Sequence, residues 1–136
     1  MTVKAGYSTP ILHVAEIEKS IGFYELLGFT TVDTDRCKPL GWARMHCEGG
    51  ALMFLRAEGP LAASAHPVML YMYTPDLPAL REQLLAAGVG VPPIRYPEHM
   101  PSGEINLIDP DGNLIPIAHW GKAQHEAWEK RIGAKT

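Results

Sequence analysis

The stretch EIEKSIGFYELLGF, from Glu16 to Phe29, decides the fold. Its apolar side chains recur at the spacing of one face of a helix, at Ile17, Ile21, Tyr24 and Leu27. Gly28 follows as the signal that ends the helix. The stretch therefore predicts an amphipathic helix that stops just before Phe29.

A second helix is predicted over PDLPALREQLLAAG, residues 75–88, where the apolar positions are Leu77, Leu80, Leu84 and Ala87. Asp76 is the expected N-cap, and Pro78 lies in the first turn, where its missing N–H costs little. Gly88 ends this helix as Gly28 ends the first one, so the two helices are in register sixty residues apart. This register indicates a duplicated unit.

The strands on either side of the helices repeat as well. A strand-like run precedes each helix, at 9–14 and at 68–74, and a hairpin follows each helix, at 42–56 and at 103–120. The turns of these hairpins are Gly49-Gly50 and Pro110-Asp111-Gly112.

A further short strand is expected over 30–34, and a proline-rich loop over 90–103. The chain is therefore predicted to be an α+β domain in which a βαβββ unit occurs twice, over about 5–58 and about 66–121. A short C-terminal helix follows, and a linker of small residues joins the two units.

Composition and charge exclude several classes of protein. The 136 residues are 46% hydrophobic and 20% charged, which suits one soluble globular domain. The net charge of −3 offers no basic surface for nucleic acid or anionic membrane. Because no apolar run could span a bilayer and the start lacks a signal-peptide core, a cytoplasmic protein is expected. Cys37 and Cys47 are expected to be free thiols there, with a single disulfide as the alternative.

Two motifs carry a resemblance to a known family: KSIGFYELLGF at 19–29 and DPDGN at 109–113. With the sixty-residue repeat, they resemble the vicinal oxygen chelate superfamily of glyoxalase I, fosfomycin-modifying enzymes, extradiol dioxygenases and bleomycin-resistance proteins. The resemblance covers about Ser8 to Gly121. It implies that the two modules curl into an incomplete barrel whose concave face holds a ligand, commonly in a homodimer.

In the metalloenzymes of that superfamily, four positions on the concave face supply His and Glu ligands to a divalent metal. The resemblance places these positions at Thr9, Met53, Met69 and Pro116. A hydroxyl, two thioethers and a proline do not replace carboxylate oxygens and imidazole nitrogens, so neither a metal nor another cofactor is expected. Because proline donates no N–H, Pro116 also predicts a free strand edge or a bulge at its position.

Strand alternation extends the expected concave face beyond the four metal positions. Ile11 and His13 share the face of Thr9, and His13 is either a ligand-contacting or acid–base residue or a half-buried histidine bonded to a neighbour. Tyr71 and Tyr73 share the face of Met69, as an aromatic pocket wall or as ordinary cross-strand packing.

The family register turns Glu104 and Asn106 inward. Glu104 is then a general base, a counter-ion for a cationic ligand, or one half of a salt bridge with Arg44 or Arg95. Without such a partner, an apolar cavity would raise the pKa of its carboxyl group. Arg44 alternates with Trp42, which either stacks on a planar ligand or packs in the core.

The remaining histidines show no ligand spacing and are expected at the surface or the rim; they are His46, His66, His99, His119 and His125. Cys37 has no sequence neighbour that could activate it as a nucleophile.

Three functions compete at this point. The leading prediction is a metal-free homodimer, similar to the bleomycin-resistance branch, that binds an aromatic or amphipathic small molecule without chemistry. The second is an enzyme of the superfamily, a lyase, isomerase or dioxygenase, that uses acid–base residues such as His13 and Glu104 or an unrecognised metal. The third is a dimeric interaction module with a vestigial cavity.

Overall fold

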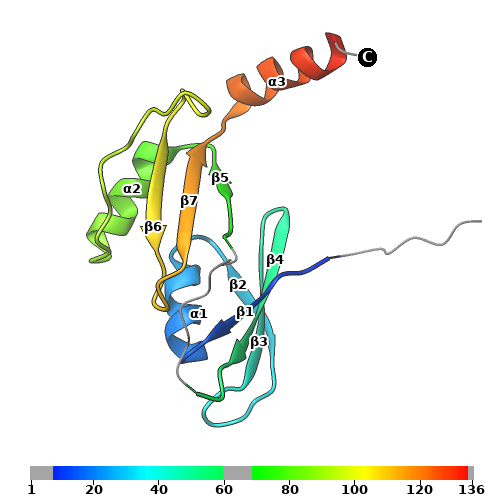
Figure 1. Cartoon of the computed structure of the whole chain (residues 1–136), viewed down its shortest axis with the longest axis vertical. Helices are drawn as coiled ribbons and strands as arrows, with labels where there is room; N and C mark the ends of the chain where they lie inside the picture. The colour runs from blue at the N-terminus through cyan, green and yellow to red at the C-terminus, as the bar shows by residue number, and fades with distance from the viewer. Residues whose placement is uncertain (1–7, 60–68, 135–136) are drawn as a thin grey trace, which may run out of the picture. The chain divides into compact units, whose positions relative to one another are not determined.

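The computed structural model describes residues 8–59 and 69–134, which fall into two compact units divided at Met69 (Figure 1). One unit holds a four-stranded sheet and the other a three-stranded sheet, and over the described residues neither closes into a barrel. The α+β prediction is confirmed. Most of the predicted linker and the starts of both predicted modules lie outside the described residues.

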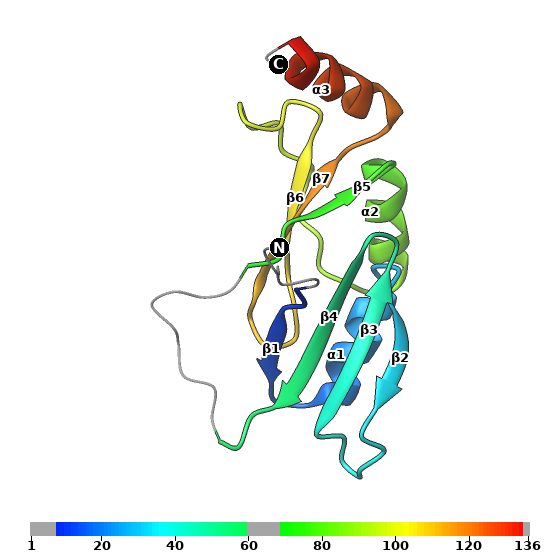
Figure 2. The same ribbon diagram turned by 90° about the vertical axis from the view of Figure 1, so that its right-hand side faces the viewer.

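The first unit has the predicted βαβββ order, with β1 (Ile11–Val14), α1 (Ile17–Glu25), β2 (Thr30–Thr34), β3 (Trp42–Cys47) and β4 (Gly50–Arg56). Its sheet has the order β1-β4-β3-β2, in which β1 is parallel to β4 and the other neighbours are antiparallel. The α1 helix packs on β2, β3 and β4 (Figure 2). The face toward α1 buries Leu12, Val14, Ala43, Met45, Leu52 and Phe54.

The second unit contains β5 (Met72–Thr74), α2 (Leu77–Ala86), β6 (Glu104–Ile108), β7 (Leu114–His119) and α3 (Lys122–Ala134). Its sheet has the order β5-β7-β6, with β5 parallel and β6 antiparallel to the central β7. The α2 helix packs on this sheet. The core of the unit is made of Leu77, Leu84, Ile105, Leu107, Ile115 and Ile117.

Both helices end as the repeat predicts. Gly28 and Gly88 adopt φ values of +95° and +83°, which side-chain-bearing residues rarely reach. The residue after each glycine donates its N–H back into the helix: Phe29 to the Tyr24 carbonyl at 3.1 Å, and Val89 to the Leu84 carbonyl at 3.0 Å. Asp76 accepts a hydrogen bond from the Ala79 N–H at 3.1 Å, which confirms the predicted N-cap.

The second unit departs from the prediction because its described residues lack the second of the four strands expected for a βαβββ module. The described segment between α2 and β6 makes only an isolated bridge, between Arg95 and Glu104. Pro92, Pro93 and Pro97 flank this bridge, and a proline has no N–H for a strand ladder.

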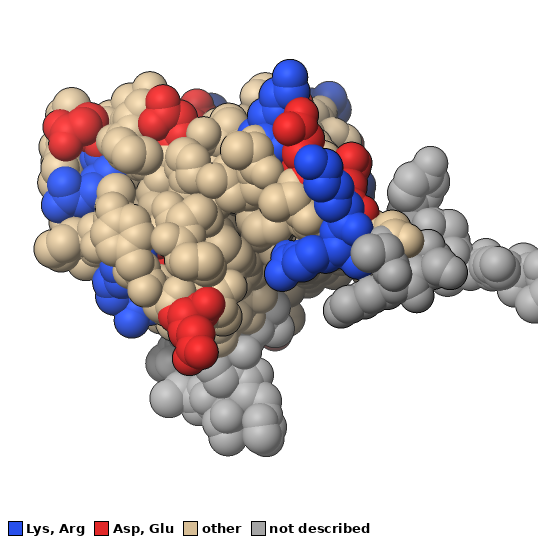
Figure 3. All heavy atoms as spheres, turned by 90° about the horizontal axis from the view of Figure 1, so that it is seen from above, with Lys and Arg blue, Asp and Glu red and all other residues tan. Residues whose placement is uncertain are grey.

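The predicted C-terminal helix is confirmed as α3, which Figure 1 shows extending past the end of β7. Trp128 and Ile132 remain exposed on it. No helix of the described residues is both long and apolar enough to cross a membrane. On the face drawn in Figure 3, acidic and basic side chains both occur, with other residues between them.

Candidate functional site

The first unit leaves one face of its sheet open, and most of the predicted site residues of that unit lie on it. Strand alternation and pairing place on this first open face Thr9, Ile11, His13, Trp42, Arg44, His46, Met53 and Leu55. Ile11, Met53 and Arg44 lie side by side across three strands, and His13, Leu55 and Trp42 form the next row. The predicted sharing of a face by Thr9, Ile11 and His13 is confirmed.

Trp42 is not a core residue, because it belongs to this face and is only half-buried. Its Nε1 donates to the Met53 Sδ at 3.3 Å. His13 is exposed, which contradicts one of its two alternatives, the half-buried histidine. Ile11 is 43% exposed, which leaves apolar surface open beside it.

Arg44 is half-buried on the same face, where two neutral groups hold its guanidinium. Its Nε donates to His46 Nε2 at 2.9 Å, and its Nη2 donates to the Thr9 hydroxyl at 3.3 Å. A ring nitrogen that accepts a hydrogen bond carries no proton, so both acceptors are uncharged. Within residues 8–59 and 69–134, Arg44 takes part in no ion pair.

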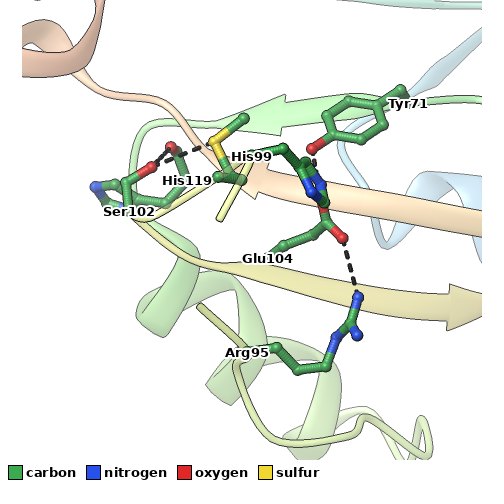
Figure 4. Close-up of polar contacts among 7 residues, drawn as sticks. Tyr71, Arg95, His99, Ser102, Glu104 and His119 are labelled. Carbon is green, nitrogen blue, oxygen red and sulfur yellow. Dashed lines mark hydrogen bonds and ion pairs between the residues drawn. The ribbon is translucent and has the colours of Figure 1, made fainter. Parts of the chain in front are cut away.

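The second unit holds a buried carboxylate, Glu104, which is 3% exposed. Its Oε2 accepts hydrogen bonds from the Tyr71 hydroxyl and from His99 Nε2, the latter at 3.0 Å, and its Oε1 accepts from Arg95 Nη2 at 3.2 Å. Figure 4 shows three donors around the carboxylate of Glu104, which lies on β6. Arg95 and His99 come from the segment before β6, and Tyr71 comes from the residue before β5. We call Tyr71, Arg95, His99 and Glu104 the Glu104 cluster. The predicted salt bridge is confirmed with Arg95, whereas Arg44 has other partners.

Electrostatics in this cluster keep Glu104 ionised. Burial raises the pKa of its carboxyl group, but hydrogen bonds from Tyr71 and His99 and the charges of His99 and Arg95 outweigh burial and lower the pKa overall. The pKa of the Tyr71 hydroxyl is raised by burial first, and then by its hydrogen bond to Glu104. Tyr71 therefore stays protonated and donates to Glu104, and the carboxylate has its donors already in place.

Two further aromatic side chains extend from the Tyr71 ring of the cluster. The Tyr71 and Tyr73 ring centroids are 5.3 Å apart, and the Tyr73 and Trp120 centroids are 6.1 Å apart. Tyr73 is 61% exposed and Tyr71 is 39% exposed, so this aromatic row of Tyr71, Tyr73 and Trp120 is not buried packing. Met69 is also exposed, whereas Asn106 is half-buried and Pro116 is buried.

Pro116 explains why β5 is shorter than the strand predicted over 68–74. In the first unit, the Met53 N–H donates to the Pro10 carbonyl at 2.9 Å and so begins the pairing of β4 with β1. Pro116 is the equivalent of Met53, because the register of β5 and β7, extended by one residue before the Met72 and Ile117 pair, would place Pro116 opposite Tyr71, as Met53 lies opposite Ile11. Without an N–H, Pro116 cannot begin the ladder, and β5 starts only at Met72.

Of the free edge or bulge expected at Pro116, the free edge is confirmed on one side of β7. The β7 strand is central in its sheet, and its pairing with β6 runs through Pro116 opposite Asn106. The missing N–H lies on the side of β5, where the ladder has not yet begun.

The donor set at the four superfamily metal positions does not fit a divalent metal. In the first unit, the Thr9 hydroxyl accepts from Arg44 and the Met53 sulfur accepts from Trp42. In the second unit, Met69 offers only a thioether and Pro116 offers no side-chain donor atom. Over the described part of the chain, no group of three His, Cys, Asp or Glu side chains could hold a metal ion.

Two histidines make contacts in the structure that were not predicted from the sequence. His99 was expected at the rim without a role, but it bonds Glu104 five residues away across the turn that precedes β6. His119 accepts the Leu77 N–H at its Nδ1, at 3.1 Å, and so caps the start of α2. The carbonyl of His119 accepts from the Ser102 hydroxyl at 2.8 Å (Figure 4). No spacing pattern signals these contacts; His66 lies outside the described residues.

Comparison with known proteins gives one family and several similar structures. The family model of the Glyoxalase/Bleomycin resistance protein/Dioxygenase superfamily matches residues 7–117. No curated protein matches the chain.

Among solved structures, a bleomycin resistance determinant encoded on the transposon Tn5 is 22% identical, with a TM-score of 0.68 over 87% of this chain and 99% of that one. A bleomycin-binding protein complexed with bleomycin is 23% identical, with a TM-score of 0.67 over 85% of this chain and 99% of that one. A mutant of the fosfomycin resistance protein FosX from Listeria monocytogenes, complexed with Mn(II), is 14% identical, with a TM-score of 0.65 over 93% and 99%. At these identities the likeness establishes the fold.

Proposed function

The chain belongs to the Glyoxalase/Bleomycin resistance protein/Dioxygenase superfamily, and from that premise we propose that it binds an aromatic or amphipathic small molecule without a metal. In this proposal the ligand stacks on the aromatic row of the second unit. The row carries the proposal because it is the aromatic surface that the described residues leave uncovered beside a polar cluster.

The exposure of the aromatic row needs an explanation. Tyr73 exposes 61% of its surface and Tyr71 39%, although aromatic side chains gain strongly from leaving water. A planar ligand that covers these rings would gain the same hydrophobic and stacking free energy. The Trp120 ring, edge-on to Tyr73, extends the surface at one end.

The Glu104 cluster gives this surface a fixed shape. Tyr71 donates its hydroxyl hydrogen to a buried carboxylate, so its ring cannot rotate away without leaving Glu104 under-bonded. A ring that is held in advance loses little conformational entropy when a ligand stacks on it. The Tyr71 oxygen still has a lone pair that can accept a hydrogen bond from a ligand.

Two further parts of the proposal concern the metal and the oligomeric state. The absence of a metal follows from the chemistry of Thr9, Met53, Met69 and Pro116, which lack carboxylate and imidazole donors. A twofold homodimer is proposed because the superfamily resemblance implies it. Among similar structures, the bleomycin-binding protein is one that holds an organic ligand.

The enzyme alternative would use Glu104 as a base. Its carboxylate already accepts from three donors, and its lowered pKa makes it a weak base near neutral pH. The raised pKa of Tyr71 likewise holds its proton in place. The Glu104 cluster is therefore better suited to fixing a binding surface than to transferring protons.

The test is a thermal-shift screen of planar aromatic compounds, including aromatic antibiotics, followed by titration calorimetry of the hits. A ligand present at a hundred times its Kd should stabilise the protein by about 2.7 kcal/mol. Tyr73→Ala should weaken binding of the hits by about tenfold or more, because it removes the most exposed ring of the row.

Tyr96→Ala is the matched control, since Tyr96 is 69% exposed but has no contact with the aromatic row. It should leave the affinities unchanged. Hits that bind the Tyr73→Ala protein as tightly as the native protein would place the binding surface elsewhere.

A further inference from the structure

The proposed function gives no role to the positive charge of Arg44. Glu104 is compensated by neighbouring donors, whereas the hydrogen bonds of the Arg44 side chain to described residues go to the neutral Thr9 and His46. We propose that Arg44 is an oxyanion subsite on the first open face, which takes the carboxylate or phosphonate group of an amphipathic ligand. The aromatic row belongs to the second unit and is not needed for this subsite.

The guanidinium is held ready for an anion. His46 fixes its Nε and Thr9 fixes one hydrogen of Nη2, so two contacts from different strands or their flanks define its orientation. The remaining N–H groups have no acceptor among the described residues. A planar guanidinium with free N–H groups can bind a carboxylate or phosphonate with two parallel hydrogen bonds.

The position of Arg44 makes its charge costly when unpaired. The side chain is half-buried on the central part of the sheet, between β4 and β2, where water reaches it incompletely. A cation in such a place gains more from an anionic partner than an exposed lysine would. The structure therefore favours an anion here, and not the cationic ligand that an uncompensated Glu104 would have favoured.

The surface beside Arg44 is apolar, so it favours a ligand whose remaining part is also apolar. Met53 and Ile11 continue the row of Arg44 across β4 and β1, and Trp42 donates its N–H to the Met53 sulfur. An anionic head on Arg44 would place an attached hydrocarbon or aryl group over these side chains. The expected ligand is an amphipathic organic anion and not a free inorganic ion.

One acidic residue needs to be considered as an internal partner. Asp33 pairs with Arg44 across the β2–β3 ladder, next to an irregularity in the register. Its Oδ1 accepts the N–H of Thr34 at 2.9 Å, and it makes no ion pair with Arg44 within 4.0 Å. If Asp33 neutralised Arg44 in solution, then Asp33→Asn would strengthen anion binding at least tenfold.

The experiment is calorimetric titration of the full chain with naphthoate, naphthylphosphonate and the neutral naphthamide. We expect at least one of the two anions to bind at least tenfold more tightly than naphthamide. The anion that binds identifies the head group. Arg44→Met should weaken the binding of that anion by about ten- to a hundredfold, which is the usual effect of losing a charged hydrogen-bonded pair. Naphthamide should bind the native and variant proteins equally.

Controls separate this subsite from folding effects and from the aromatic row. Arg56→Gln removes the same charge from an exposed residue that alternates to the opposite side of β4, and it should not change anion affinity. Arg44→Lys keeps the charge but loses the paired geometry, and its affinity should fall between those of native protein and Arg44→Met. Tyr73→Ala should leave the Arg44-dependent part of the anion affinity unchanged, because Tyr73 belongs to the second unit.

Three results would overturn the subsite: no binding of either anion up to about 1 mM, equal affinity for anion and amide, or equal anion affinity in Arg44→Met and native protein. A tenfold gain in Asp33→Asn would also overturn it, because Asp33 would then be the partner of Arg44. The proposed function is tested separately, by the thermal-shift screen and by the effect of Tyr73→Ala on the binding of its hits.

Discussion

Replacing Tyr71 with phenylalanine removes one hydroxyl group from the Glu104 cluster and keeps the aromatic ring. Glu104 is 3% exposed and then keeps only the donors from His99 and Arg95. Leaving a buried charged group without one of its hydrogen bonds costs about 1–3 kcal/mol. Because Tyr71 is itself 39% exposed, water can partly replace the lost hydroxyl, so we expect a loss of about 1–2 kcal/mol in the free energy of unfolding.

The pH dependence of this loss tests its cause. The pKa of Glu104 is lowered in the folded protein, so its contribution to stability is present above the unfolded pKa and is lost as pH falls through the folded pKa. Without the Tyr71 hydroxyl, the largest of the effects that lower the pKa of Glu104 is lost, so this pKa should rise. The loss of stability at acid pH should therefore begin at a higher pH in the variant. The difference in the free energy of unfolding between variant and native protein should shrink once Glu104 is protonated in both proteins.

Urea unfolding of the native and Tyr71→Phe proteins, at a series of pH values from about 3 to 8, measures both effects. The carbon NMR shift of the Glu104 carboxyl group reports its pKa directly. Tyr73→Phe is the matched control, because the Tyr73 ring is 61% exposed and Glu104 accepts from Tyr71 and not from Tyr73. A loss of stability that is equal at pH 3.5 and pH 7, or a Glu104 pKa that does not move, would refute the reasoning.

Three further predictions concern other parts of the chain. Asp109→Ala should lower the free energy of unfolding, measured in urea, by about 2 kcal/mol. The reason is that this buried carboxylate accepts from the Asp111 and Asn113 backbone N–H groups and from the Asn113 side chain. Asp111→Ala is the control, and an equal loss of stability in that variant would contradict the assignment. Protein purified and then incubated with Mn(II), Ni(II) or Zn(II) should retain no stoichiometric metal by elemental analysis after desalting, and one bound equivalent would contradict the proposed absence of a metal site. Light scattering at micromolar concentration should give twice the chain mass of 14.9 kDa, whereas a mass of 14.9 kDa would contradict the homodimer.

The elements with a local signal could be predicted from the sequence. The two helices and their stops at Gly28 and Gly88 follow from a period of 3.6 residues and from the need for positive φ. The sharing of a face by Thr9, Ile11 and His13 follows from strand alternation. The strand predicted over 68–74 was too long, because its extent depends on a hydrogen-bond donor that Pro116 lacks on a strand more than forty residues later.

Individual residues of the candidate site could be predicted from the sequence, but most of the contacts between them could not. Glu104 could be singled out as a carboxylate on the inward face, and Arg95 as one of two possible partners. His99 could not, because it reaches Glu104 through the path of a proline-rich loop that has no regular structure. The ligand-binding role of these side chains stays a prediction.

The sequence by itself determined the duplicated α+β plan, the helix limits and the side chains that share each sheet face, because each of these depends on a pattern within a few neighbouring residues. Only the tertiary structure decided which charges are compensated. Glu104 accepts from three donors in two separate segments, whereas Arg44 donates to a threonine and a neutral histidine. The physical reason is that electrostatic free energy depends on distances between groups from different segments, and strand register and loop path set those distances.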